Sequence, residues 1–383
     1  MRIAFLHPHF TIRGGGSHVI LELASRLSRR GHDVAVISLR QDPALLGGYH
    51  NVKFYQIPGR LPSQVLHYGQ EPIIFSRLVK AIKDFCPDVL VSNVAPSEYW
   101  GAMYKLAHLQ TKAVWYCHDS TILGSGSHIF EDLSPPLRLL LRSTTGNPLF
   151  RKLTRSVVRR MDGFVANSVY TADILKRLYG LAATVVYPGV DPDIYKPFQA
   201  TDPYLLCVGQ LTKYKNFDLA IDSIALCSDG LKDAGIRLRI VGDGPQRDEL
   251  AARAKMAGVA DLVEFAGPKE YNEMPEIYGK ARLTLQPSIH EGFGLVPIES
   301  MACGTPVIAG QGGGAMETIV DGVTGFLVPP TKQEFASAIE KSLRNSDLIE
   351  KMRLAARAHV LQYFTWDRSV VDFERVLDGF RPE

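Results

Sequence analysis

The sequence predicts an α/β protein built from two doubly wound, Rossmann-like domains with parallel sheets, and three observations predict this fold class. The chain has 383 residues, more than one hydrophobic core ordinarily organises. Short apolar runs alternate with longer segments of helical periodicity, which is typical of parallel sheets joined by crossover helices. The alternation stops at a proline-punctuated stretch and then begins again, which favours a domain boundary at that stretch.

The first domain is expected to span residues 1–195. Helices fit between its strands, for example over Ser17–Arg30, after which Gly31 can take the left-handed conformation that commonly ends a helix. Its strands are predicted where short buried runs occur, at 2–6, 33–38, 88–92, 112–117 and 163–166.

The second domain is expected to span residues 203–365, after a linker and hinge near 191–203. The last helix, about 366–383, is expected to pack back on the first domain. Open α/β sheets bind ligands at the carboxyl ends of their strands, so we expect the two sheets to face a central cleft. Strands of the second domain are predicted at 204–208, 236–241, 262–266, 282–286 and 306–308.

The composition excludes several classes of protein. Hydrophobic residues make up 46% and charged residues 22% of the chain, as in globular proteins. No apolar run approaches the roughly 20 residues that span a bilayer, and the amino terminus lacks the features of a secretory signal. The five cysteines are scattered, which indicates neither a disulfide framework nor a zinc site. We therefore expect a cytoplasmic location, either in solution or at the cytoplasmic face of the membrane.

Basic residues concentrate in one segment of the first domain. Seven Lys or Arg residues and no acidic residue lie between Asp132 and Asp162, interleaved with leucines. Over 138–160 this mixture suits either peripheral contact with an anionic membrane or a solvated helix face whose apolar side lies in the core. Stacking aromatics are nearly absent there, so no nucleic-acid partner is expected.

The segment 287–306 carries the most chemistry. It follows a predicted strand, turns through Gly292 and Gly294, and begins a helix whose start Pro297 fixes near Val296. The backbone N–H groups of residues 293–295 therefore lie at a helix N-terminus, where a pyrophosphate can bind.

Two glutamates flank this helix start. Glu291 is expected in the preceding turn and Glu299 in the first helical turn. A carboxylate accepts hydrogen bonds from two neighbouring hydroxyls, so each could hold a pair of sugar hydroxyls. The alternative for Glu299, a capping-box glutamate, needs Ser or Thr three residues earlier, where the chain has Val296. Glu291 could also be an exposed turn acid.

At this point the chain resembles the GT-B glycosyltransferases of the retaining family 4. Glu291 and Glu299 match that family's E-x7-E motif, and the resemblance extends over Val241–Pro245, the 312–314 glycine turn with Glu317, and Asp321–Val328. It implies the GT-B fold and a donor site that holds a nucleotide-sugar. In such a site Glu299 would bind the ribose and Glu291 the transferred sugar. The other implied donor contacts are Gly242, Lys269, Glu270, Phe293, Gly294 and Leu295.

A second predicted cluster of donor residues follows the first strand of the second domain. A fixed cation there can neutralise a departing nucleoside diphosphate without a bound metal. The family has arginine and lysine at two positions of this loop, where this chain has Gln210 and Lys215. Lys215 keeps its implied role, whereas a neutral glutamine cannot offset phosphate charge, which leaves Lys213 to assist.

The first domain contributes two further candidates by resemblance. Gly15 and Gly16 lie in a glycine-rich turn before a helix, a weak signal that a flexible turn also explains; in the family this loop faces the donor phosphates and the acceptor. His118 follows the 112–117 strand, where the family places a histidine near the transferred sugar. The run Tyr116–His118 resembles the family's mannosyltransferases of surface-polysaccharide assembly. Asp119 is a candidate acceptor-side base.

These residues predict a retaining, metal-independent glycosyltransferase without a cofactor. Its catalytic residues would be His118, Lys215 and Glu291, its donor a UDP- or GDP-linked hexose of the glucose or mannose type, and its acceptor a glycan or lipid-linked molecule in polysaccharide or glycolipid assembly. Two alternatives remain open: a GT-B nucleotide-sugar epimerase, and a non-catalytic subunit that binds a nucleotide-sugar and recruits a partner enzyme.

Overall fold

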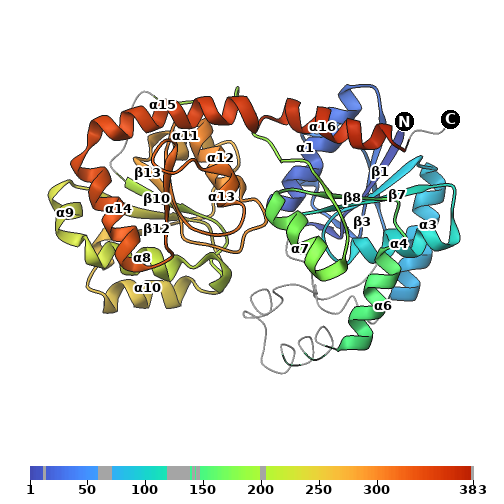
Figure 1. Ribbon diagram of the computed structural model, residues 1–383, viewed down its shortest axis with the longest axis horizontal. Helices are drawn as coiled ribbons and strands as arrows, with labels where there is room; N and C mark the ends of the chain where they lie inside the picture. Colours follow the sequence, from blue (N-terminus) through green and yellow to red (C-terminus); the bar gives the residue numbers. More distant parts are fainter. Residues whose placement is uncertain are drawn as a thin grey trace. The chain divides into compact units, whose positions relative to one another are not determined.

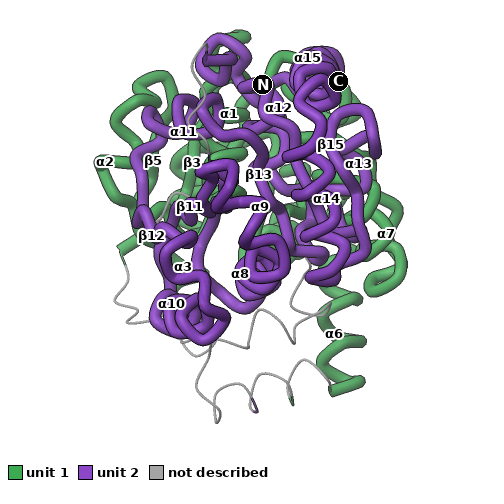
Figure 2. The backbone as a smooth tube through the Cα atoms, turned by 90° about the vertical axis from the view of Figure 1, so that its left-hand side faces the viewer, with its two compact units in different colours: residues 1–124, 143–188, 366–383 green, residues 125–142, 189–365 purple. Residues whose placement is uncertain are grey.

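The computed structural model describes residues 1–11, 14–58, 71–118, 139, 143, 147–198 and 204–380 (Figure 1). The chain separates into two compact units (Figure 2). The first unit comprises residues 1–124, 143–188 and 366–383, and the second comprises 125–142 and 189–365. The chain thus leaves the first unit after Pro188 and returns to it with its last helix.

The first unit is built on a seven-stranded sheet in which every adjacent pair of strands is parallel. The strand order is β5-β3-β1-β6-β7-β8-β9. A separate parallel pair joins β2 (His9–Phe10) to β4 (Arg40–Gln41). The sheet strands are β1 (Arg2–Leu6), β3 (Asp33–Ser38), β5 (Lys53–Gln56), β6 (Val89–Ser92), β7 (Lys112–Cys117), β8 (Gly163–Ala166) and β9 (Thr184–Val185).

Helices of the first unit cover both faces of this sheet (Figure 1). The last helix, α16 (Trp366–Asp378), lies beside α1 (Gly15–Arg29). The Phe373 ring of α16 packs 6.2 Å from the ring of Phe5 and 5.4 Å from that of Tyr116. The remaining helices are α2 (Pro43–Leu46), α3 (Glu71–Phe85), α4 (Ser97–Ala107), α6 (Pro148–Val158) and α7 (Val169–Tyr179).

The second unit has a six-stranded parallel sheet in the order β12-β11-β10-β13-β14-β15. Helices α8 (Phe217–Leu226), α10 (Arg247–Met256) and α14 (Lys332–Arg344) bury apolar side chains in its main core. Helices α11 (Met274–Lys280) and α12 (Leu295–Ala302) pack on each other, and α12 also packs on α15 (Ser346–Tyr363). The strands are β10 (Tyr204–Val208), β11 (Arg237–Val241), β12 (Val263–Gly267), β13 (Leu283–Gln286), β14 (Val307–Gly310) and β15 (Gly325–Val328).

The predicted fold class is confirmed, because both units are doubly wound parallel α/β structures. All ten predicted strands occur, with ends that differ by at most two residues. Strands β2, β4, β5, β9 and β15 were not predicted. Strands β5 and β9 are short and lie at the two edges of their sheet, where partly exposed residues leave little apolar pattern. Among the described residues, no helix is both long enough and apolar enough to cross a membrane.

Candidate functional site

The loop after β13 leads into α12, as the sequence predicts. Gly294 is the N-cap of α12, and its φ of +83° is a conformation that favours glycine. The helix begins at Leu295 and carries Pro297 in its first turn, where a missing N–H costs no intrahelical bond. The first backbone N–H groups of α12 lack intrahelical acceptors and carry partial positive charge, so they can receive an anion.

Glu291 is held immediately before this helix start by two side chains. The Lys215 ammonium lies 2.7 Å from Oε1 of Glu291, and the Gln286 amide donates a hydrogen bond to the same oxygen. The side chain of Glu291 is only 13% exposed, so the alternative of an exposed turn acid is wrong. The structure therefore brings together two predicted residues, Lys215 and Glu291, with a third that sequence reasoning missed. Gln286 could have been found as a polar residue that ends a buried strand.

The loop that carries Lys215 is fastened to the Glu291 loop at further points. Lys215 belongs to a single 3₁₀ turn, Lys213–Lys215, that follows β10. The Tyr214 hydroxyl donates to the His290 carbonyl at 2.8 Å, and the Asn216 amide donates to the Pro287 carbonyl at 3.3 Å. These contacts fix the distance between ammonium and carboxylate, because they hold the backbones of both loops.

The 312–314 glycine turn supports the site through close backbone packing. A Cβ on Gly313 would lie 2.5 Å from the Glu291 carbonyl oxygen, and one on Gly314 would lie 2.3 Å from that of Phe293. The Gly314 N–H also donates to the Glu291 carbonyl at 2.9 Å. The 312–314 turn therefore sets the position of the Glu291 backbone, and larger residues at 313 and 314 would displace it.

Close backbone packing also explains why residue 242 is glycine. Gly242 has φ +132°, and a Cβ on it would lie 1.9 Å from the carbonyl oxygen of Gly209. Gly242 thus lets the loop after β11 pass directly over the loop after β10. Its predicted contact with the donor remains a prediction.

Glu299 lies in the second turn of α12, not in the first as predicted, because the helix begins at Leu295. The Tyr278 hydroxyl donates to Oε2 of Glu299 at 2.8 Å. Burial raises the pKa of the Glu299 carboxyl to about 7, against the opposing effect of the hydroxyls of Tyr278 and Tyr195. The capping-box alternative is excluded, since the N-cap is Gly294, which has no side chain.

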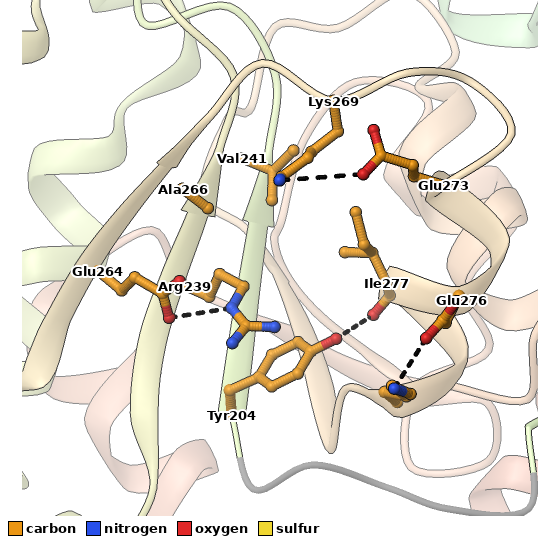
Figure 3. Close-up of a pocket in the computed structure, with 10 residues that line it drawn as sticks. Tyr204, Arg239, Val241, Glu264, Ala266, Lys269, Glu273, Glu276 and Ile277 are labelled. Carbon is orange, nitrogen blue, oxygen red and sulfur yellow. Dashed lines mark hydrogen bonds and ion pairs between the residues drawn. The ribbon is translucent and has the colours of Figure 1, made fainter.

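Lys269 and Glu270 are exposed residues of the loop after β12. Lys269 Nζ lies 3.9 Å from the Glu273 carboxylate, which also accepts a 2.8 Å hydrogen bond from the Glu270 N–H. Lys269 lines a cavity of about 350 Å³ between β10–β12 and α11 (Figure 3). Arg239, which also lines the cavity, lies over the Tyr204 ring and pairs with the Glu264 carboxylate. Cations and carboxylates alternate around the cavity, so it has no dominant charge.

The other predicted donor residues make fewer contacts. The Gln210 side chain is exposed, and its predicted contact with the donor remains a prediction. Gly15 and Gly16 are the first two residues of α1, and a Cβ on Gly16 would lie 3.2 Å from Val94. The described part of the chain contains no group of three or more His, Cys, Asp or Glu residues that could hold a metal ion.

His118 directly follows β7 in the first unit and is 9% exposed. Its Nε2 lies 3.3 Å from Oδ1 of Asn93, and its backbone carbonyl accepts a 2.8 Å hydrogen bond from the Asn167 amide. Burial, with a smaller effect of His7, lowers the pKa of His118 to about 3, so the ring is neutral at physiological pH. The candidate acceptor-side residue Asp119 lies outside the described residues.

Two family models match consecutive parts of the chain. The model "Glycosyltransferase Family 4" matches residues 13–194, and the model "Glycosyl transferases group 1" matches residues 195–359. The chain belongs to this family of glycosyltransferases and has their GT-B fold.

Curated relatives include enzymes named D-inositol 3-phosphate glycosyltransferase. The one from Streptomyces griseus is 32% identical over 60% of this chain and 56% of its own length. The one from Stackebrandtia nassauensis is 28% identical over 94% of this chain and 85% of its own. The chain thus spans little more than half the length of several of the curated relatives it matches.

Solved structures agree on the fold. Anabaena Alr3699/HepE, in complex with UDP and glucose, superposes with a TM-score of 0.79 at 21% identity and covers 99% of this chain and 100% of its own. Sucrose-phosphate synthase from Thermosynechococcus elongatus gives a TM-score of 0.80 at 20% identity, with 99% and 98% covered.

Proposed function

We propose that this protein is a retaining hexosyltransferase that uses a UDP- or GDP-sugar of the glucose or mannose type. The observation that carries the proposal is the Lys215–Glu291 pair beside the N-terminus of α12. A helix N-terminus that can receive a diphosphate and a carboxylate that can accept sugar hydroxyls would then lie close together along one loop, which supports binding of a sugar diphosphate. The family relationship and the names of the curated relatives also support sugar transfer.

In the proposed reaction, the acceptor oxygen bonds to the anomeric carbon while the bond from that carbon to the diphosphate oxygen breaks. The departing diphosphate oxygen takes the proton of the acceptor hydroxyl. The N–H groups of α12 and the Lys215 ammonium stabilise the negative charge that develops on the diphosphate. An ammonium has three donors, so Lys215 can bind a phosphate oxygen without leaving Glu291. This arrangement supplies the needed charge from side chain and backbone, and we propose that no metal takes part.

Residues Glu291 and Glu299 orient the donor in this proposal. Glu291 accepts hydrogen bonds from hydroxyls of the transferred sugar, and Glu299 from those of the ribose. For His118 we propose contact with a substrate hydroxyl. The proposed acceptor is a glycan or a lipid-linked molecule.

Membrane contact through α6 is a further part of the proposal. Leu149 and Leu153 lie one turn apart on α6 and are 75% and 62% exposed. On α4, which packs against α6, Leu106 is exposed as well. As the solvated-face alternative expects, α6 has an apolar side in the core, where Val158 is buried and Phe150 and Val157 pack against the same cluster. Leu149 and Leu153 do not belong to that side and face solvent. Basic residues on and after α6, among them Lys152 and Arg160, are suited to anionic headgroups.

The decisive experiment incubates the purified protein with UDP-glucose or GDP-mannose, with and without a lipid-linked glycan acceptor. Donors are first ranked by thermal shift at equal concentration, because a ligand of the folded state stabilises the protein more the more tightly it binds. The proposal expects an acceptor-dependent product whose anomeric configuration, read by NMR, equals that of the donor. Inversion would refute retention. An acceptor-independent change of the nucleotide-sugar would favour the epimerase, and donor binding without turnover would favour the non-catalytic subunit.

A further inference from the structure

Asn93 immediately follows β6 and is almost completely buried, with 1% of its surface exposed. Its backbone N–H donates to the Ser97 hydroxyl at 2.8 Å, and its carbonyl accepts from the Trp115 indole at 3.0 Å. Its side-chain amide nitrogen lies 3.0 Å from the Leu6 carbonyl and 3.3 Å from the Val91 carbonyl. Both carbonyls can only accept, so the NH₂ end of the amide must face them.

The orientation of this amide determines the protonation of the His118 ring. With its NH₂ group committed to the two carbonyls, Asn93 presents Oδ1 to Nε2 of His118. An amide oxygen can only accept, so Nε2 must carry the proton. The ring is neutral, and a neutral imidazole has one protonated nitrogen. Nδ1 is therefore an unprotonated acceptor.

Nδ1 of His118 is buried and has no hydrogen-bond partner among the described residues. Leaving a buried polar atom without a partner costs free energy. The rest of the residue is fixed, since the Asn167 amide holds its carbonyl and the Tyr116 ring packs 4.0 Å from its own. An acceptor that is rigidly held and unused at the carboxyl end of a parallel strand is suited to an incoming O–H donor.

We infer that Asn93 is a positioning residue that holds His118 as the tautomer protonated on Nε2, so that Nδ1 accepts a hydrogen bond from a substrate hydroxyl. The substrate part of this inference rests on the proposed function, whereas the tautomer part does not. His118 then acts as a neutral acceptor, and not as a cation toward the diphosphate or as a general acid.

The tautomer is measured on the unmodified protein with ¹⁵N-labelled histidine. Long-range ¹H–¹⁵N correlation spectra at neutral pH distinguish a protonated from an unprotonated ring nitrogen, and the His118 signals are identified by their loss in His118→Gln. We expect a protonated Nε2 and an unprotonated Nδ1. A protonated Nδ1, with or without a protonated Nε2, would overturn the inference. This result requires neither donor nor turnover.

Asn93→Ala tests the consequence for catalysis, with Asn51→Ala as the matched control. Asn51 also bonds through its side chain within the first unit, to Ser25, but makes no contact with His118. We expect Asn93→Ala to produce a mixture of His118 tautomers and to lower kcat/KM about tenfold, the scale of one lost neutral hydrogen bond. Asn51→Ala should change neither the His118 tautomer nor kcat/KM. If the tautomers mix while kcat/KM stays unchanged, Nδ1 does not serve the substrate. Absence of transfer in the unmodified protein would count against the proposed function and leave the tautomer result standing.

Discussion

The Lys215 ammonium and the Glu291 carboxylate lie 2.7 Å apart although 76 residues separate them in the sequence. Both side chains are largely buried, so the pair attracts more strongly than an exposed ion pair would. The two groups predicted to bind different parts of the donor, its diphosphate and its sugar, therefore form one unit before the donor arrives. Removing either one changes the environment of the other.

Lys215→Ala is expected to lower kcat by about 10²–10³-fold, the usual cost of removing one charge-stabilising group from a transition state. Because Glu291 is left without its cation, the double variant Lys215→Ala/Glu291→Gln should lose much less than the product of the two single losses. Initial rates of the unmodified protein, Lys215→Ala, Glu291→Gln and the double variant form a double-mutant cycle that measures this coupling.

The control for this cycle is Lys232→Ala, whose side chain is exposed and lies 4.0 Å from Asp261. It should transfer at the unmodified rate, and a chelator should leave the unmodified rate unchanged. If the double variant lost activity by the full product of the two single losses, the two residues would not act as a unit. A rate that falls with chelator but is unchanged in Lys215→Ala would contradict charge neutralisation by the lysine.

Donor affinity is expected to rise with pH through about 7 because of Glu299. A carboxyl with a pKa of about 7 is mostly protonated at pH 6, where one of its oxygens becomes a donor and no longer suits two ribose hydroxyls. The dissociation constant for UDP or GDP should therefore be about tenfold larger at pH 6 than at pH 8. Titration calorimetry at both values measures it, and Glu299→Gln should remove the dependence. Equal affinities at both pH values would argue against the ribose assignment.

The same pKa fixes the sign of a stability effect. Since the folded-state pKa lies above the ordinary 4.5, folding favours the protonated carboxyl. This contribution to the free energy of unfolding is fully present below pH 4.5 and is lost as pH rises through 7. Glu299→Gln should therefore raise the melting temperature relative to the unmodified protein at pH 8, and by less at pH 5. A larger gain at pH 5 would contradict the effect of burial.

Much of this fold could be predicted because buried parallel strands are short continuous apolar runs, as β10 and β14 are. The start of α12 could be placed within one residue, since Pro297 restricts where a helix can begin. The Glu291 environment could not be predicted. Its contacts with Lys215 and Gln286 depend on how two loops are held against each other. The spacing of residues in the sequence does not give the distance between loops that follow different strands.

The structural reasons for glycine or asparagine at particular positions could not be predicted either. Gly242 is identified from sequence only as part of a family motif, whereas its close approach to Gly209 appears once both loops are placed. The Asn93–His118 contact likewise joins residues that follow adjacent strands. Topology brings them together, and no spacing rule would select that asparagine.

Gly242→Ala is expected to destabilise the second unit by about 1–3 kcal/mol, because a methyl group cannot occupy a position 1.9 Å from a carbonyl oxygen without moving both loops. Gly235→Ala is the matched control, since Gly235 also has positive φ, +65°, but has open space around its Cβ. It should cost only the strain of the left-handed conformation, about 1 kcal/mol. Urea unfolding gives both values, and equal losses would show that the approach to Gly209 is not the reason for glycine at 242.

The leucines of α6 are expected to carry membrane contact, because burying a leucine side chain yields about 1.5–3 kcal/mol. Leu149→Ser/Leu153→Ser should weaken binding to vesicles containing anionic lipid at least tenfold in co-sedimentation. The control is Leu354→Ser, which removes a leucine that is 77% exposed on α15 of the second unit. Raising the salt concentration should weaken binding of the unmodified protein further, since the basic residues around α6 contribute attraction that ions screen. Binding that neither the leucine substitutions nor salt reduces would exclude α6 as the contact surface.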